Sequence, residues 1–294
     1  MRKCELNGII IVDKPQGWTS HDIVAKLRGV FGEKRIGHGG TLDPMATGVL
    51  PVFVGRATRA AQFCENAVKK YTAGLTLGIT TDTQDTTGNI LSEKPCTVTE
   101  KELNAVLENF KGEISQIPPM YSAVKIGGKK LYELARRGVE VEREARKITI
   151  CSLDARRVSD NEYLLDVTCS KGTYIRTLCH DIGEMLGCGG CMSSLRRTQA
   201  GVYTENDAVT MDEILKCREE GKADMLLKSV DSIFKDKNAV TIDKKYMKAV
   251  LNGNAFPCVY PDGQYRAYAP DGGFLMLGEV VRGEMKTIKS FFEV

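Results

Sequence analysis

The sequence is poor in the residues that most often build metal and redox sites. Its 294 residues include only three histidines, and among its ten cysteines one pair, Cys188 and Cys191, has the two-residue spacing of a metal-binding motif. A tetrahedral zinc site of this type would need a second ligand pair at a suitable spacing, and none is present. We therefore expect no metal and no other cofactor, and we interpret the cysteines as free thiols.

Long apolar runs are also missing. The only apolar run near the start, Ile9–Val12, is stopped by Asp13 and Lys14 and is too short for a signal peptide. No run approaches the ~18 apolar residues of a membrane span. We expect a cytoplasmic protein without a membrane partner, and the length suggests about two domains.

The chain has no strong excess of charge of one sign. The 41 basic and 38 acidic residues give a net charge of +3. Basic residues nevertheless gather between Lys125 and Lys147, where eight lysines and arginines stand against four glutamates. This segment is either a phosphate-binding surface or a solvated helix face, and charge alone favours the helix face.

Several local patterns predict helices. Ser20 can cap a helix whose apolar stripe runs from Ile23 to Phe31. A threonine followed three residues later by glutamate predicts two further helix starts, at Thr99 and Thr210. A fourth stripe begins at Tyr174 and should end near Gly187, shown by the apolar residues Tyr174, Ile175, Leu178, Ile182 and Met185.

Strand-like segments are interspersed with these helices. They are rich in β-branched, aromatic or alternating apolar residues, and they are Ile9–Val12, Tyr71–Leu77, Ile148–Leu153 and Tyr163–Thr168. The pattern predicts an α+β fold with a mixed sheet over residues 1–234. After a charged stretch at 235–238, one helix over Lys244–Leu251 precedes short segments separated by proline and glycine. We therefore predict a small β-rich barrel over residues 235–294.

The most unusual segment is Arg35–Pro51, with the sequence RIGHGGTLDPMATGVLP. Three glycines within four residues let the backbone turn sharply and let a ligand approach closely. Asp43 followed by Pro44 is typical of a helix start, and the local pattern alone favours that interpretation. The alternative is a carboxylate exposed on a glycine-rich loop. The spacing matches neither a phosphate-binding P-loop nor a dinucleotide fingerprint, and Asp82 and Asp85 are interpreted as part of a polar turn.

Within this segment, Gly37–Gly48 closely resembles the signature of the bacterial tRNA pseudouridine synthase B (TruB-type) family, which acts on uridine 55 of tRNA. Other matching segments follow in the right order: Asp13–Pro15, Lys70–Ala73, Leu77–Asp85, Gln116–Lys125, Ser170–Arg176 and Leu195–Arg197. The resemblance covers about residues 8–205. The tail resembles an RNA-binding PUA domain more weakly.

The resemblance implies isomerisation of uridine 55 in the tRNA T loop to pseudouridine. The reaction breaks the bond between uracil nitrogen and ribose, turns the base and rejoins it through carbon, which requires no metal or redox partner. The family's essential aspartate falls on Asp43, which acts on the sugar as a nucleophile or as a base. The aligned Arg176 would lie beside it.

The resemblance also assigns the binding residues. The target base must be flipped out of the loop, with Tyr71 as its aromatic platform. Tyr174 and Leu195 would line the pocket, and His38 would touch RNA near the flipped base. Without the resemblance, Tyr71 is a half-buried strand tyrosine, Tyr174 and Leu195 are core residues, and His38 is an ordinary loop residue.

The basic segment corresponds to the family's inserted arm, about residues 120–147, which grips the T loop. Lys125, Lys129 and Lys130 would then contact the RNA backbone, while Lys14 and Pro15 would support the catalytic loop. We expect tRNA as the partner, no obligatory protein partner and a monomer. Two alternatives are a protein that mainly holds and refolds tRNA, and an aspartate-dependent glycosidase, which would need a second carboxylate beside Asp43.

Overall fold

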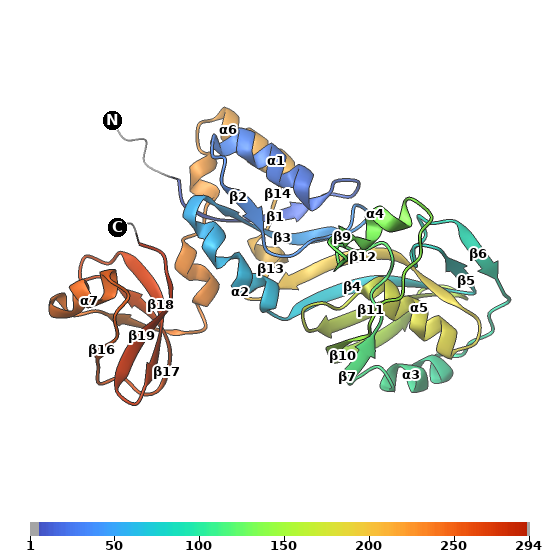
Figure 1. The fold of residues 1–294 in the computed structure, drawn as a ribbon. Coiled ribbons are helices and arrows are strands. Elements are labelled where there is room, and N and C mark those ends of the chain that lie inside the picture. The colour runs from blue at the N-terminus through green and yellow to red at the C-terminus, as the bar shows by residue number, and fades with distance from the viewer. Residues whose placement is uncertain (1–5, 293–294) are drawn as a thin grey trace.

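A ten-stranded mixed sheet runs through the body of the molecule in the computed structural model, which describes residues 6–292 (Figure 1). The main strand order is β14-β1-β3-β12-β4-β11-β10-β7, with β2 paired to β3 and β13 to β12. The strands are β1 (Gly8–Lys14), β2 (Ile36–His38), β3 (Thr47–Val54), β4 (Lys69–Leu77), β7 (Gly112–Gln116), β10 (Arg146–Arg157), β11 (Glu162–Cys169), β12 (Gly190–Ala200), β13 (Tyr203–Thr204) and β14 (Val209–Thr210).

The middle of this sheet determines which loops meet. Strand β12 pairs in parallel with β3 and antiparallel with β4, so it lies between the two. Arg197 is opposite Gly48 on one side and Tyr71 on the other. A side chain at Gly48 would come within 2.3 Å of the Arg197 carbonyl oxygen, so the close approach of β3 and β12 needs glycine there.

Five helices of the described residues pack against the sheet of the body. They are α1 (Ser20–Phe31), α2 (Ala61–Asn66), α3 (Glu100–Glu108), α5 (Ile175–Met185) and α6 (Met211–Glu219). Thr99 and Thr210 cap α3 and α6 as their patterns predict, each in a capping box with the glutamate three residues later. The prediction for α1 was wrong by one residue, because Thr19 is the cap and pairs with Asp22. The hydroxyl of Ser20 instead binds a distant loop.

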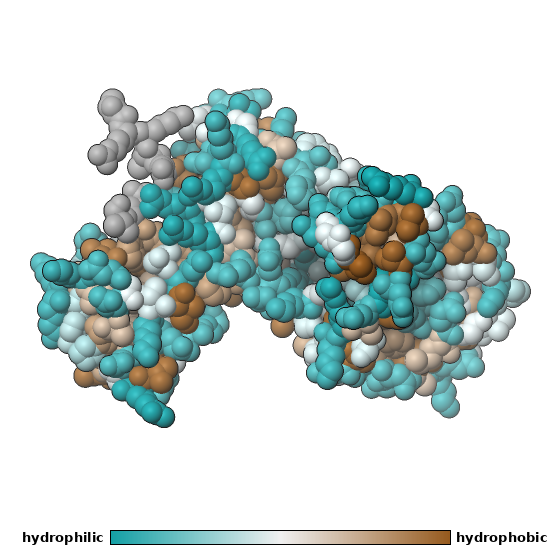
Figure 2. All heavy atoms as spheres, in the orientation of Figure 1, coloured by the Kyte–Doolittle hydropathy of each residue, from teal (hydrophilic) through white to brown (hydrophobic). Residues whose placement is uncertain are grey.

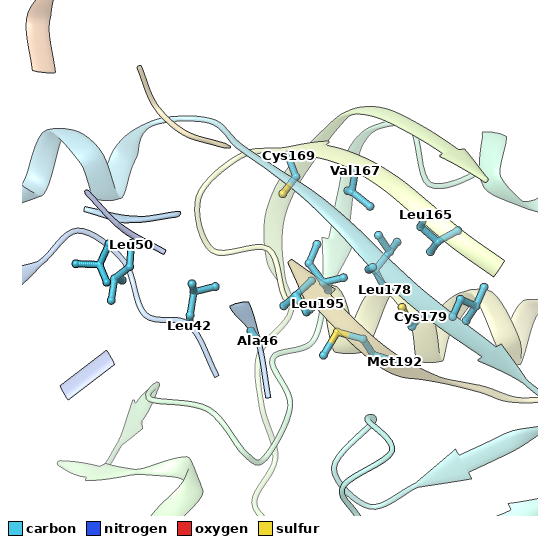
Figure 3. Close-up of a cluster of buried hydrophobic side chains, with 14 of the residues drawn as sticks. Leu42, Ala46, Leu50, Leu165, Val167, Cys169, Leu178, Cys179, Met192 and Leu195 are labelled. Atoms are coloured by element: carbon cyan, nitrogen blue, oxygen red, sulfur yellow. The ribbon is translucent and has the colours of Figure 1, made fainter. Parts of the chain in front are cut away.

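The core is built from the inner faces of the sheet and these helices. On α1 the predicted stripe is buried except for the half-buried Phe31, with Ile23 and Leu27 fully inaccessible. Each such side chain contributes roughly 1.5–3 kcal/mol when it is buried. Figure 3 shows the cluster reaching from Leu50 and Leu42 through Leu195 and Met192 toward α5. The loop between β2 and β3 therefore rests on the main core.

An arm of irregular chain leaves the sheet between β7 and β10. It contains a short hairpin of β8 (Lys125–Ile126) and β9 (Lys129–Lys130), followed by α4 (Leu131–Ala135). Gly127 and Gly128 both have positive φ, which suits the two-residue turn of this hairpin. A second hairpin, β5 (Ile79–Thr81) with β6 (Ile90–Glu93), projects from the same half of the body.

The tail forms its own five-stranded sheet with the order β15-β17-β18-β19-β16 (Figure 1). Its elements are β15 (Asn238–Thr241), α7 (Met247–Leu251), β16 (Phe256–Pro257), β17 (Gly263–Tyr268), β18 (Phe274–Val281) and β19 (Glu284–Ser290). The α+β class, the mixed sheet and the β-rich tail are therefore confirmed. The assignment of 235–294 as a separate PUA-like domain stays a prediction.

The tail joins the body through the short 3-10 helix Val230–Phe234. Phe234 is buried, and its ring packs edge-on against Phe63 of the body at 5.0 Å between centroids. The same ring contacts Phe274 and Phe291 of the tail. This aromatic layer is part of the apolar cluster that joins the two parts, which also includes Ile233 and Leu277.

Replacing Phe234 by alanine should lower the free energy of unfolding by about 3–5 kcal/mol, because it leaves a cavity at the junction. Urea unfolding followed by fluorescence and circular dichroism would measure the loss. As a control, Val259→Ala at a side chain that is 96% exposed should change stability by less than ~0.5 kcal/mol. Equal stability of the two variants would show that the aromatic layer does not hold the tail.

Candidate active site

Asp43 lies on the loop that connects β2 to β3. The N-cap interpretation was wrong, because no helix follows Asp43. The chain makes a turn, in which the Asp43 carbonyl accepts a hydrogen bond from the Ala46 N–H at 3.0 Å, and it enters β3 at Thr47. The reason is long-range: β3 must return antiparallel to β2, and a helix after Asp43 would prevent that pairing.

Two buried polar side chains, Lys14 and Ser20, form hydrogen bonds with the main chain of this loop. The Lys14 ammonium donates to the carbonyl oxygens of Trp18 at 2.7 Å and Pro44 at 3.3 Å, and also to its neighbour Pro15. The Ser20 hydroxyl accepts from the Leu42 N–H and donates to the Leu42 carbonyl. Burial lowers the pKa of Lys14 to about 8. Lys14 therefore holds the loop that carries Asp43 through its bond to Pro44.

The carboxylate of Asp43 is paired with Arg176 from the first turn of α5. The two are joined at 2.9 Å between Arg176 Nε and Asp43 Oδ2. Arg176 is buried, and it also donates to the carbonyl oxygens of Thr83 and Tyr121. The Asp43 side chain keeps 36% of its surface exposed. Arg176 thus fixes one carboxylate oxygen while the group remains open to a substrate.

Asp85 is a site residue that the sequence interpretation missed. It lies in the predicted polar turn, but it is only 5% exposed, and its Oδ2 faces Arg176 Nε at 3.8 Å. Its Oδ1 accepts hydrogen bonds from the Thr83 hydroxyl and from the amide and hydroxyl of Thr87. The available signal was the run of threonines around an aspartate, which can hold a carboxylate inside a turn.

The predicted pocket residues lie on strands and helix ends around this loop. Tyr71 on β4 is half-buried, and Leu195 on β12 is buried. Leu195 belongs to the core cluster that includes Leu42 and Ala46 of the Asp43 loop (Figure 3), and Tyr71 packs against this cluster. Burial raises the pKa of the Tyr71 hydroxyl, and the negative charge of Asp43 adds to the effect. Tyr71, Leu195 and the Asp43 loop are therefore brought together.

Tyr174 and His38 are placed at the edges of the site. Tyr174 precedes α5, and its main chain exchanges two hydrogen bonds with the Gln116 side chain. His38 is half-buried, its ring meets His21 edge-on at 5.4 Å, and its buried Nδ1 has no partner within residues 6–292. Burial lowers the pKa of His38 to about 4, so it is neutral at pH 7.

The three lysines predicted to contact RNA lie on the hairpin of the arm. Lys125 and Lys129 are exposed, and Lys130 is half-buried beside Tyr132. In the described chain no carboxylate lies within 4 Å of these ammonium groups. Apolar and hydrophilic surfaces adjoin in the region of α4 (Figure 2). The arm also reaches the site directly, because the Tyr121 carbonyl accepts the hydrogen bond from Arg176.

The two closely spaced cysteines lie inside the protein. Cys188 and Cys191 are buried free thiols, and burial raises the pKa of each to about 11. Within the described residues, no group of three or more histidine, cysteine or acidic side chains could hold a metal ion. None of the helices in this range has the length and apolar character needed to cross a membrane.

Comparison with known proteins defines the class to which this fold and site belong. Residues 28–175 match the TruB family pseudouridylate synthase N-terminal domain, and residues 176–235 match the tRNA pseudouridylate synthase B C-terminal domain. The chain therefore belongs to the TruB family of pseudouridine synthases.

Individual relatives agree with this membership. The chain is 48% identical to tRNA pseudouridine synthase B of Alkaliphilus oremlandii, over 85% of this chain and 82% of the relative. It is 39% identical to the enzyme of the same name from Clostridium kluyveri, over 97% and 100%. Among solved structures, a Cbf5-Nop10-Gar1 complex contains a chain with a TM-score of 0.74 and 27% identity, covering 98% of this chain and 85% of that chain.

Lys14→Met should destabilise the protein at pH 7 by about 1–3 kcal/mol, because three partly buried carbonyl oxygens lose their donor. The pH dependence tests the cause. The pKa of Lys14 is about 8 in the folded protein and 10.5 in the unfolded chain, so the unfolded chain binds more protons between these values. Wild-type stability should therefore rise relative to Lys14→Met between about pH 8 and 10.5, by an amount on the order of 2 kcal/mol.

Denaturant titrations of both proteins from pH 7 to 10.5 would measure this difference. The exposed Lys26 on α1 provides a matched control, and Lys26→Met should follow wild type at every pH. A constant difference between wild type and Lys14→Met above pH 8 would contradict the assignment of a lowered pKa to Lys14.

Proposed function

We propose that this protein converts uridine 55 in the T loop of tRNA to pseudouridine, with Asp43 as the catalytic carboxylate. The observation that carries the proposal is the Asp43–Arg176 pair, in which a buried arginine orients a carboxylate that stays open to solvent. Such a group can act on a ribose carbon or on an adjacent proton. The relatives named tRNA pseudouridine synthase B support tRNA as the substrate.

The side chains around Asp43 can form a pocket for a base that is flipped out of the RNA. Tyr71 offers a ring on β4, Leu195 offers an apolar side chain on β12, and both adjoin the Asp43 loop. A flipped pyrimidine needs such a stacking surface. In this proposal Tyr174 completes the pocket, and neutral His38 contacts RNA near the flipped base by hydrogen bonding rather than by charge.

The second carboxylate near Asp43 does not favour glycoside hydrolysis. A glycosidase needs a second carboxyl group that reaches the substrate as an acid or a base. Asp85 is buried, and it is occupied by Thr83, Thr87 and Arg176. It can position Arg176, but it cannot exchange protons with a sugar.

The arm and the tail would supply RNA affinity. In the proposal, Lys125, Lys129 and Lys130 contact the phosphates of the T stem-loop, and residues 235–294 act as a PUA-like accessory domain. The protein would act as a monomer without an obligatory protein partner. A role confined to holding and refolding tRNA would leave the Asp43–Arg176 geometry unexplained.

Asp43→Asn provides the sharpest test of this function. Asparagine preserves the size of the side chain but removes the charge needed for the sugar chemistry. The variant should bind unmodified tRNA with nearly wild-type affinity and form no detectable pseudouridine, a loss of at least ~10⁴-fold in single-turnover rate. Melting temperature, tRNA affinity and product formation should be measured side by side. A variant that isomerises uridine at a rate close to wild type would eliminate Asp43 as the catalytic residue.

The arm is tested by salt dependence. Each phosphate contact that is lost should reduce the slope of log affinity against log salt by up to ~1. Replacing Lys129 and Lys130 with alanine should therefore flatten the slope and weaken binding at low salt. The matched control is Lys101→Ala together with Lys216→Ala, which removes the same charge from exposed positions on α3 and α6, outside the arm and the tail. If the arm variant and this control have the same salt slope, the arm lysines do not contact RNA phosphates and the arm is a solvated surface.

A further inference from the structure

Three buried cations lie under the Asp43 loop and Tyr71. Lys14 and Arg197 are at most 1% exposed, and Lys69 is 6% exposed. Each donates to main-chain carbonyls: Lys14 as described above, Lys69 to Glu65 and Ala67, and Arg197 to Val49 at 2.7 Å and Gly40 at 3.1 Å. In the described part of the chain, none of the three has a carboxylate within 4 Å.

Buried charges are normally paired, because moving an unpaired ion out of water costs several kcal/mol. Around Asp43 the charges do not balance. The site carboxylates Asp43 and Asp85 stand against Arg176 and the three buried cations, which leaves four minus two, or +2. The carboxylates of Asp22 and Glu65 also act on Lys14 and Lys69, but both are exposed, so solvent screens their charge. The carbonyl dipoles offset part of the desolvation cost, but they do not cancel the net charge. The net positive charge of these buried groups would therefore stabilise an additional negative charge at the site.

Arg197 is the cation that the sheet places beside the base platform. Its Cα is opposite that of Tyr71 in the β12–β4 pair, so the two side chains share one face. The two side chains are close enough to interact, because the positive charge of Arg197 opposes the rise in the pKa of the Tyr71 hydroxyl that burial causes. Because Arg197 is only 1% exposed, its guanidinium cannot contact RNA phosphates directly.

The proposed reaction creates a suitable negative charge. When the bond between uracil N1 and ribose C1′ breaks, its electron pair stays on the base. This holds whether Asp43 bonds to C1′ or removes the C2′ proton. The uracil anion carries its charge on N1 and the two carbonyl oxygens. The anion is consumed when C5 bonds to C1′. In that step the Asp43–C1′ bond breaks, or C2′ regains its proton from Asp43. The C5 proton is then released and N1 takes up a proton.

We propose that Arg197, acting through the Tyr71 hydroxyl, stabilises the uracil anion that forms when the glycosidic bond breaks. Arg197 is thus a positioning residue that supplies a fixed positive potential. This inference rests on the proposed function. Lys14 and Lys69 add to the same potential from beneath the loop and from the start of β4.

The test compares two target bases in a T-arm hairpin, uridine and 5-fluorouridine. Fluorine withdraws electrons and stabilises the base anion. Cleavage of the glycosidic bond of 5-fluorouridine should therefore depend less on the positive charge of Arg197. With uridine, Arg197→Gln should slow glycosidic cleavage by roughly 10- to 100-fold at saturating RNA. With 5-fluorouridine the fold decrease in cleavage rate caused by Arg197→Gln should be at least about threefold smaller than with uridine. Arg197→Lys keeps the positive charge and should restore most of the wild-type rate on both bases.

Arg196 provides a matched control on the same strand. Its side chain pairs with Asp13 and Glu205 at the surface, so Arg196→Gln removes the same charge and should leave the rate within about threefold of wild type. Tyr71→Phe keeps the ring, removes the hydroxyl that transmits the charge, and should show the same dependence on the base. If the Arg197 variants do not fold, the rates of Tyr71→Phe on uridine and 5-fluorouridine are sufficient to test the inference.

Three results would overturn the inference: a wild-type rate in Arg197→Gln, an equal defect on both bases in Arg197→Gln or Tyr71→Phe, or an effect confined to RNA affinity. A different result would overturn the proposed function instead. If wild type forms no pseudouridine on the uridine hairpin, the chemistry itself is wrong. The two failures are therefore distinguishable within one set of measurements.

Discussion

Strand β12 pairs in parallel with β3 and antiparallel with β4, and this double register decides which side chains meet at the site. It brings Leu195 and Arg197 between the strand that follows Asp43 and the strand that carries Tyr71. A slip of one residue would turn both side chains to the other face of the sheet. Gly48 and Gly74 make the close approach possible, because a side chain at either position would collide with β12.

Local patterns predicted those parts of the fold that depend on neighbouring residues. The helix caps at Thr99 and Thr210 use bonds across three residues, and the structure confirms both. The Asp43–Pro44 pattern is equally local, but it gave a wrong helix because pairing of β3 with β2 outweighs the preference of two residues. Ser20 was misassigned for a similar reason: its hydroxyl binds Leu42, 22 residues away.

The candidate site was only partly predictable for the same physical reason. The resemblance located Asp43 and Arg176, which the structure joins in an ion pair. The sequence alone gave no reason to expect Asp85 or Arg197 to be buried, since charged residues are usually exposed. Burial of a charge depends on partners brought from elsewhere in the chain, such as the carbonyls of Gly40 and Val49 for Arg197.

Satisfying buried cations with main-chain carbonyls has a consequence that carboxylate pairing would not have. A carboxylate partner would cancel the field of Lys14 or Arg197 at the site, whereas a carbonyl dipole satisfies the donor and leaves the net charge in place. The same bonds also tie the cations to the loop that carries Asp43. Because the carbonyls belong to a fixed backbone, the loop and the positive potential are held in a constant relation before substrate arrives. Such preorganised electrostatics require no reorientation during the reaction, which is the condition under which buried charge contributes most to rate.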